Sequence, residues 1–190
     1  MRQKVQKTRV DRPHADILYG AKVLLRFSSE EREGRYYEWM GALLLSAFAF
    51  EGYLNYLGRK LFSSWESFER FMRWDAKVML VADDIGFKLD KSQPPFQTVQ
   101  NLFAFRNNVA HLKPNPEMRE EHETDTLDFT IFEPIKTEVE KFCNEVNARR
   151  CIEDVEKMIK LFHKQAKVGG GDPLQPGHQS GSVTPANPPG

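Results

Sequence analysis

The chain has 190 residues, the length of a single domain with short tails, which excludes most multidomain enzymes. Its 27 basic side chains balance 27 acidic ones, which excludes a protein that coats nucleic acid through its overall charge. A hydrophobic share of 40% and a charged share of 28% predict a packed core and exclude disorder along the whole chain.

The N-terminal segment, residues 1–12, is basic and carries five Lys or Arg side chains against Asp11. We predict a mobile arm that is either simply solvated or follows an RNA backbone. The segment lacks the apolar stretch of a secretory signal peptide, so we expect a cytoplasmic protein. The only two cysteines, Cys143 and Cys151, fit neither a disulfide framework nor a zinc pattern, and we expect reduced thiols.

The first two predicted helices follow this arm. Pro13 suits a first helical turn, and apolar residues then recur at helical spacing: Ile17, Leu18, Ala21, Leu24 and Leu25. After Gly34 a long second helix is expected from Tyr36 to about Phe62. Its apolar stretch, residues 39–57, has about the right length to span a bilayer, but it contains Glu51 and Asn55 and many small residues. We therefore expect no membrane span but a central apolar helix, buried on all sides.

The remaining helices are expected between Ser64 and Gly86, from Pro95 to Pro114, and from Pro134 onward. The last region is either one long helix or two helices that join near Ala148. An acidic loop and a short strand, residues 127–132, are expected before it.

The C-terminal segment, residues 168–190, holds 6 of the 12 glycines and 5 of the 11 prolines. This composition predicts a disordered tail. Residues 13–167 are then the folded domain. Its predicted fold is all-α, a bundle of about five or six helices.

The helix that starts at Pro95 carries the residues best suited to catalysis. At about 100° per residue its apolar side chains form one face, and Arg106 projects from near the middle of that face. An arginine in this position needs an ion-pair partner or a cleft. His111 lies roughly 140° further around the helix, and Asn107 lies one turn before His111.

Arg106, Asn107 and His111 together suit phosphoryl chemistry. A histidine can take a proton from a ribose 2′-hydroxyl or give one to a leaving 5′-oxygen, and a guanidinium can neutralise the charge that develops on phosphorus. Such chemistry needs no metal or other cofactor. The alternative is a salt-bridged arginine and a surface histidine without catalytic roles, and the spacing alone does not decide between the two.

The segment LFAFRNNVAHLKP resembles the signature helix of the HEPN (higher eukaryotes and prokaryotes nucleotide-binding) superfamily. The motif of that superfamily is an arginine, four to six residues and then a histidine, often with a polar residue directly after the arginine. Here these positions are Arg106, His111 and Asn107, and Asn108 is a supporting polar residue. The long apolar helix with the sequence SAFAFEGYLNYLG before the motif is also similar to that family.

The resemblance implies an all-α homodimer in which two Arg/His motifs face each other, and for many members a metal-independent endoribonuclease that cleaves RNA. Such members often serve as toxins with a cognate antitoxin, or as defence components. Other members are inactive, so a helical adaptor that binds RNA or a protein partner is the alternative. Lys113 stands where one toxin subfamily has a tyrosine that is modified, so the sequence does not support that form of regulation.

Two further features bear on this site. Glu51 interrupts the most apolar helix and shares a face with Asn55, and a buried acid needs a partner. Arg106 is one candidate partner, and a surface pairing with Arg59 or Lys60 is the alternative. Phe105 and Leu112 are expected to form an exposed apolar edge through which the chain dimerises.

Overall fold

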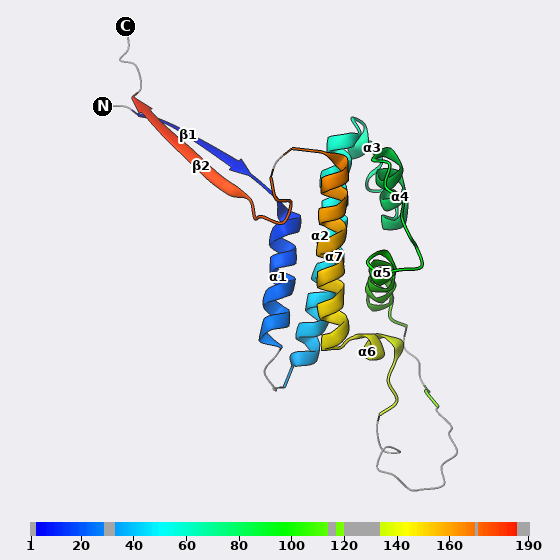
Figure 1. Cartoon of the computed structure of the whole chain (residues 1–190). Coiled ribbons are helices and arrows are strands. Elements are labelled where there is room, and N and C mark those ends of the chain that lie inside the picture. Colours follow the sequence, from blue (N-terminus) through cyan, green and yellow to red (C-terminus); the bar gives the residue numbers. More distant parts are fainter. Residues whose placement is uncertain (1–2, 29–32, 114–116, 120–133, 170, 186–190) are drawn as a thin grey trace.

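The computed structural model describes residues 3–28, 33–113, 117–119, 134–169 and 171–185, and this part of the chain is mostly helical (Figure 1). The helices are α1 (Pro13–Phe27), α2 (Arg35–Leu61), α3 (Trp65–Phe68), α4 (Trp74–Asp84), α5 (Phe96–Ala110), α6 (Glu138–Phe142) and α7 (Glu145–Ala166). Two strands, β1 (Gln3–Val10) and β2 (His178–Pro185), form a small antiparallel sheet. The fold is therefore mostly helical, but the prediction of a purely α-helical bundle was wrong.

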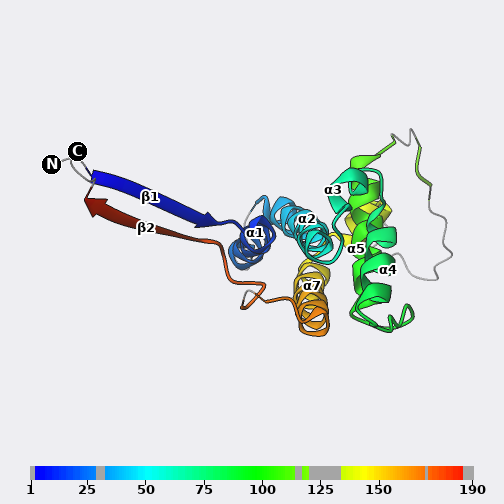
Figure 2. The same cartoon turned by 90° about the horizontal axis from the view of Figure 1, so that it is seen from above.

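The helices form a bundle around α2. Helices α1, α2 and α7 run side by side, and α4 and α5 lie on the other side of α2 and α7 from α1 (Figures 1 and 2). Figure 1 shows α5 nearly end-on, whereas Figure 2 shows α2 and α7 end-on, so α5 crosses these two helices at a steep angle. This crossing directs one side of α5 toward the middle of α2.

Short-range signals explain several helix ends. Pro13 stands in the first turn of α1, where its missing N–H group costs no hydrogen bond. Gly34 directly precedes α2 and has φ +93°, a left-handed backbone conformation that other residues rarely adopt. In the last region two helices form, and they meet at Asn144 rather than near Ala148. The Asn144 side chain accepts a hydrogen bond from the Asn147 N–H group and so begins α7.

The core lies between α2, α5 and α7 and is rich in aromatic rings. Phe50 of α2 packs against Phe103 of α5, with ring centroids 6.3 Å apart, and against Phe162 of α7, at 6.5 Å. All three side chains are fully buried, and each such side chain contributes about 1.5–3 kcal/mol through loss of water contact. This packing joins α5 and α7 to α2.

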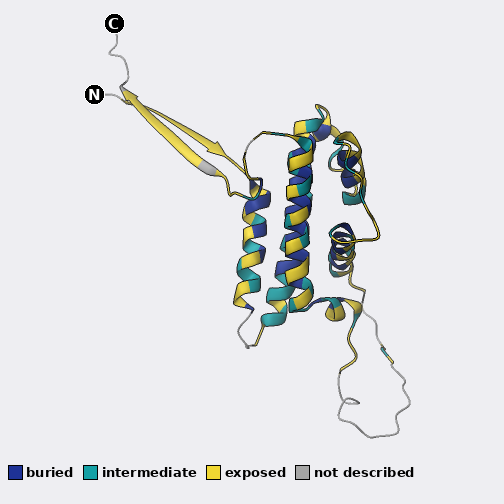
Figure 3. Cartoon of the chain, viewed as in Figure 1, coloured by how far each residue is buried: buried dark blue, intermediate teal, exposed yellow. Residues whose placement is uncertain are grey.

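Helix α2 is long and central, but it is not buried on all sides as predicted (Figure 3). Tyr37 and Phe48, both on α2, are exposed. Polar residues near its C-terminal end, Arg59 and Lys60, also face the solvent. Among the described residues no helix is both long and apolar enough to cross a membrane.

Strands β1 and β2, one from each terminal segment, pair with each other. Gln3 lies opposite Pro185 and Val10 lies opposite His178 in an antiparallel register. The prediction of a disordered tail is therefore wrong for residues 178–185. The composition was misleading because strand pairing uses backbone groups, which glycine and serine supply as well as any other residue. The strand predicted over 127–132 lies outside the described residues.

The base of this sheet is anchored on the helices. Arg12 Nη1 donates a hydrogen bond to the carbonyl of Asp172 at 2.6 Å. His14 Nε2 is 2.9 Å from the carbonyl of Pro173, and both residues are buried. Leu174 packs against the hydrophobic core. The segment that enters β2 therefore belongs to the folded unit, which extends beyond the boundary predicted at residue 167.

Candidate functional site

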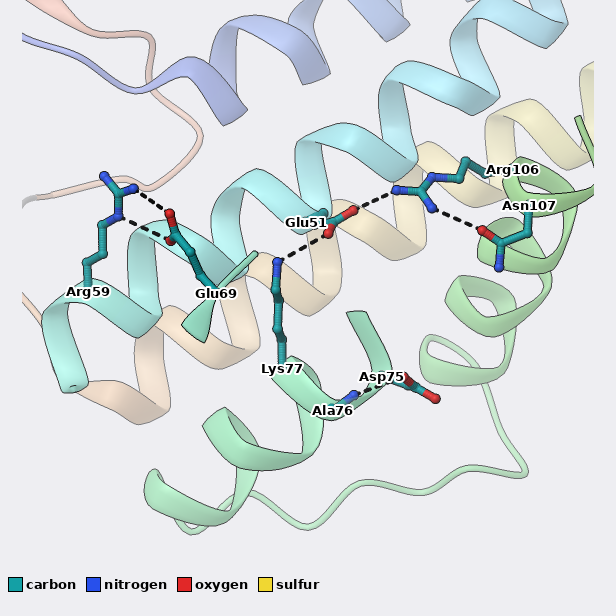
Figure 4. A network of polar contacts seen from close by, with 8 residues as sticks. All are labelled: Glu51, Arg59, Glu69, Asp75, Ala76, Lys77, Arg106 and Asn107. Carbon is teal, nitrogen blue, oxygen red and sulfur yellow. Dashed lines mark hydrogen bonds and ion pairs between the residues drawn. The ribbon is translucent and has the colours of Figure 1, made fainter. Parts of the chain in front are cut away.

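Arg106 lies on the side of α5 that faces α2, and it forms an ion pair with Glu51 (Figure 4). Its Nη2 donates a hydrogen bond to Glu51 Oε2 at 2.9 Å. The two side chains are 29% and 24% exposed, so the pair is neither fully solvated nor closed off from solvent. Of the two partners that the sequence left open for Glu51, the structure has Arg106.

Two further contacts orient the guanidinium. Arg106 Nη1 donates to Asn107 Oδ1 at 3.0 Å, so the residue after the arginine is its hydrogen-bond partner. The guanidinium carbon also lies 5.8 Å from the ring centroids of Phe48 and Phe103, within the range of cation–π attraction. With one nitrogen on Glu51 and one on Asn107, the rest of this five-donor group can still meet an anion.

Lys77 is the residue of this network that the sequence analysis missed. It lies on α4 with only 3% of its surface exposed, and its Nζ donates to Glu51 Oε1 at 3.2 Å. Glu51 therefore bridges two cations from two different helices, as Figure 4 shows. A signal was present in the sequence, because Lys77 stands four residues before the apolar Val81 and so on the same side of α4, which is buried.

His111 caps the C-terminal end of α5, and its side chain is exposed. Its backbone N–H group donates to the carbonyl of Asn107 at 3.0 Å, which closes the last turn. Within the described residues no hydrogen bond or ion pair joins the imidazole to Arg106. The two residues therefore share one end of α5, but the arginine faces α2 and the histidine faces the solvent.

Asn55 and Asn108, the other two supporting residues of the sequence prediction, lie in different places. Asn55 lines a hollow of about 620 Å³ near the start of α1. Asn108 is exposed and lines a hollow of about 320 Å³ between α5 and α6, where Lys141 is also found. The structure therefore groups Glu51 with Arg106 and Asn107, and places these two asparagines elsewhere.

The surface pairing that had been the alternative for Glu51 is not formed in the structure. Arg59 instead donates to Glu69 Oε1 at 2.8 Å and lies 3.6 Å from Glu66. The hydrogen bonds that Arg59 donates to Glu69 lower the pKa of Glu69, and the charge of Arg59 makes a smaller Coulombic contribution in the same direction. The Lys60 ammonium lies over the ring of Tyr56, with 6.0 Å to the centroid.

The apolar edge that was expected to carry a dimer contact is smaller than predicted. Phe105 is buried within the protomer, where its ring stacks on Phe142 of α6 with centroids 5.2 Å apart. Leu112, by contrast, is 62% exposed. The prediction for Phe105 was wrong because α6, which is distant in sequence, covers that side of α5.

The two cysteines are buried free thiols and offer no nucleophile at neutral pH. Burial raises the pKa of Cys143 to about 11 and that of Cys151 to about 12. Both are therefore protonated near pH 7, and the thiolate is the reactive form.

In the described part of the chain, no three His, Cys, Asp or Glu side chains are grouped so as to hold a metal ion. Comparison with known proteins adds no relative: no family model matches the chain, and neither a curated protein nor a solved structure matches it.

Proposed function

We propose that this protein is a metal-independent endoribonuclease of HEPN type that acts as a homodimer in the cytoplasm. Arg106 stabilises the charge on the phosphoryl group, His111 acts as general acid or base, and Asn107 positions the arginine. A role as a toxin or defence component with a cognate antitoxin belongs to the same proposal, and it comes from the resemblance of the Arg106 segment to that superfamily.

The observation that supports this proposal most is the double restraint on Arg106. Its guanidinium is held by Glu51 and Asn107, is partly exposed, and lies on the same helix end as the solvent-facing His111. An arginine fixed before substrate arrives loses little entropy when it binds a phosphate.

The proposed reaction needs only the RNA and these side chains. One imidazole removes the proton of a ribose 2′-hydroxyl, and the 2′-oxygen attacks the adjacent phosphorus. The bond from phosphorus to the 5′-oxygen breaks, and a protonated imidazole gives that oxygen its proton. The products are a 2′,3′-cyclic phosphate and a free 5′-hydroxyl. In a homodimer the two copies of His111 could supply the base and the acid.

Purified protein should therefore cleave single-stranded RNA in the presence of EDTA and leave 2′,3′-cyclic ends. His111→Ala should reduce kcat roughly 10²- to 10⁴-fold, the usual cost of losing a general acid or base. Arg106→Ala should cost a similar factor and also raise KM, since the guanidinium holds phosphate in the ground state as well. Full activity in the Arg106→Ala/His111→Ala double variant would exclude this function.

A catalytically inactive helical adaptor is the second candidate, and the internal ion pair is the observation that favours it. Both terminal nitrogens of Arg106 already have partners within the protomer, as expected of a structural arginine. The adaptor predicts that the wild-type protein cleaves no RNA in a broad panel, and that Arg106→Ala lowers the thermal midpoint as its main effect. Cleavage lost on His111→Ala would exclude the adaptor.

A further inference from the structure

The sheet formed by β1 and β2, here called the terminal ribbon, is exposed on both faces. It extends away from the helices on the side opposite α4 and α5 (Figures 1 and 2). Its one apolar cross-strand pair, Val5 and Val183, is 57% and 59% exposed. A two-stranded sheet by itself is only marginally stable in water. A surface of this kind is well suited to a partner that covers it.

The charge of the terminal ribbon indicates the chemistry of that partner. Lys4, Lys7 and Arg9 all come from β1, and β2 carries no Lys, Arg, Asp or Glu. Arg9 pairs with Asp11 at 3.2 Å, but within the described chain Lys4 and Lys7 have no ion-pair partner. A second copy would bring like charges together, so a polyanion fits this surface better.

The ribbon also supplies neutral hydrogen-bonding groups beside its lysines. Side chains alternate between the two faces, so Lys4, Gln6 and Thr8 share one face. The residues opposite them on β2 are Thr184, Ser182 and Ser180. This face therefore combines an ammonium group with hydroxyl and amide groups that can meet phosphate and sugar oxygens.

A hollow of about 620 Å³ opens at the base of the terminal ribbon, where Asp11 follows β1. Its lining residues include Tyr56, Lys60 and Asn55, and the Lys60 ammonium lies 6.0 Å from the centroid of the Tyr56 ring. The Oδ1 atom of Asn55 is buried and has no hydrogen-bond partner. An aromatic ring, a cation and an unpaired amide oxygen are the groups that receive an unstacked base with its phosphate.

We propose that the terminal ribbon and this hollow bind single-stranded RNA, with the phosphates along β1 and one base in the hollow against Tyr56. The choice of RNA rests on the proposed function, while the charge and the hollow are independent of it. A duplex does not fit, because its bases are stacked inside the helix and cannot enter the hollow. The site lies across the bundle from α5, so it holds the substrate without contributing to the chemistry at Arg106.

The test measures binding rather than cleavage. A labelled, unstructured RNA of about 16 nucleotides is titrated with His111→Ala protein, and the Kd is followed against salt concentration. In that protein, Lys4→Gln/Lys7→Gln should weaken binding and reduce the salt slope by about 0.7, the contribution of one phosphate contact on a single strand, because Lys4 and Lys7 lie on opposite faces and the RNA meets the ammonium of one face. Tyr56→Leu should weaken binding roughly 5-fold or more through loss of stacking.

The matched control is Lys88→Gln/Lys91→Gln, which removes the same charge from exposed positions on the far side of the bundle. It should leave the salt slope unchanged. An equal loss in the control, or an unchanged slope in Lys4→Gln/Lys7→Gln, would overturn the proposal. Equal binding of DNA with the same sequence, or of duplex RNA, would overturn the choice of single-stranded RNA. Loss of binding in Lys4→Gln/Lys7→Gln alone supports the site even when wild-type protein cleaves nothing.

Discussion

Glu51 and Arg106, which are 55 positions apart in the chain, meet at 2.9 Å between Oε2 and Nη2. The other oxygen of the same carboxylate accepts a hydrogen bond from the buried Lys77. One carboxylate thus balances two cations from α4 and α5, which makes Glu51 the residue on which the whole arrangement depends. Its loss would leave Lys77 as a buried charge without its hydrogen-bonded partner.

Glu51→Gln should therefore lower the free energy of unfolding by about 1–3 kcal/mol, because a largely buried cation loses its counter-charge. Adding Lys77→Met removes that cation and should restore most of the stability. Any RNA cleavage should stay low in the double variant, because Arg106 has still lost its carboxylate. Urea unfolding and cleavage assays on the same samples separate the two effects.

The control for this experiment is Glu66→Gln, which removes an exposed acid that contacts Arg59. Exposed ion pairs contribute little, so the change should stay within about 0.5 kcal/mol. If the Glu51→Gln protein were as stable as this control, a group other than Glu51 would have to balance the charge of Lys77.

Two truncations test how the C-terminal segment is attached. Removing residues 178–190 takes away β2 and should leave the thermal midpoint of the helical bundle nearly unchanged, because the terminal ribbon projects away from it. Removing residues 168–190 also takes away the Pro173 carbonyl that His14 contacts and the packed side chain of Leu174. The longer deletion should cost about 1–3 kcal/mol. Equal midpoints for the two truncated proteins would contradict the anchoring contacts.

The buried His14 predicts a dependence of stability on pH. Burial lowers its pKa from 6.5, the hydrogen bond to Pro173 and the charge of Asp16 act in the opposite direction, and Arg12 and His163 lower it further. The unfolded chain therefore binds the proton more readily than the folded chain does. Stability from this group is complete above pH 6.5 and falls as the pH drops below that value toward the folded pKa.

Thermal midpoints at about pH 7.5 and pH 5.5 measure this effect. His14→Gln keeps a donor for the Pro173 carbonyl but cannot be protonated in this range. The difference between the two midpoints should therefore be smaller in His14→Gln than in wild type. An unchanged difference would mean that another group is responsible.

Two glycine substitutions test the packing of α2. A Cβ atom at Gly58 would overlap the indole of Trp65, which is fully buried and cannot move away. Gly58→Ala should therefore destabilise the protein by about 1–3 kcal/mol. At Gly20 the added atom would only touch the side chain of Leu45, at 3.4 Å. Gly20→Ala should be neutral or stabilise by up to about 1 kcal/mol, since alanine favours the helix. Chemical unfolding of both variants gives the comparison.

Much of the candidate site could be predicted from the sequence because it lies on single helices. The spacing of apolar residues predicted the α5 helix and put Arg106 among them, which required a partner for the guanidinium. Glu51 was a candidate partner because it was the one acid in the apolar stretch of the central helix. The place of Lys77 was not predicted, since its burial depends on which side of α4 packs against α2.

The helices were predictable for a local reason: contacts three and four residues apart repeat within one segment and leave a pattern in the sequence. Only the tertiary structure decided that α6 covers Phe105, that Asn55 and Asn108 lie apart from Arg106, and that β1 pairs with β2. Each of these depends on segments that are distant along the chain. The pairing of the two termini left no hydrophobic pattern, because its backbone hydrogen bonds are largely independent of side-chain type.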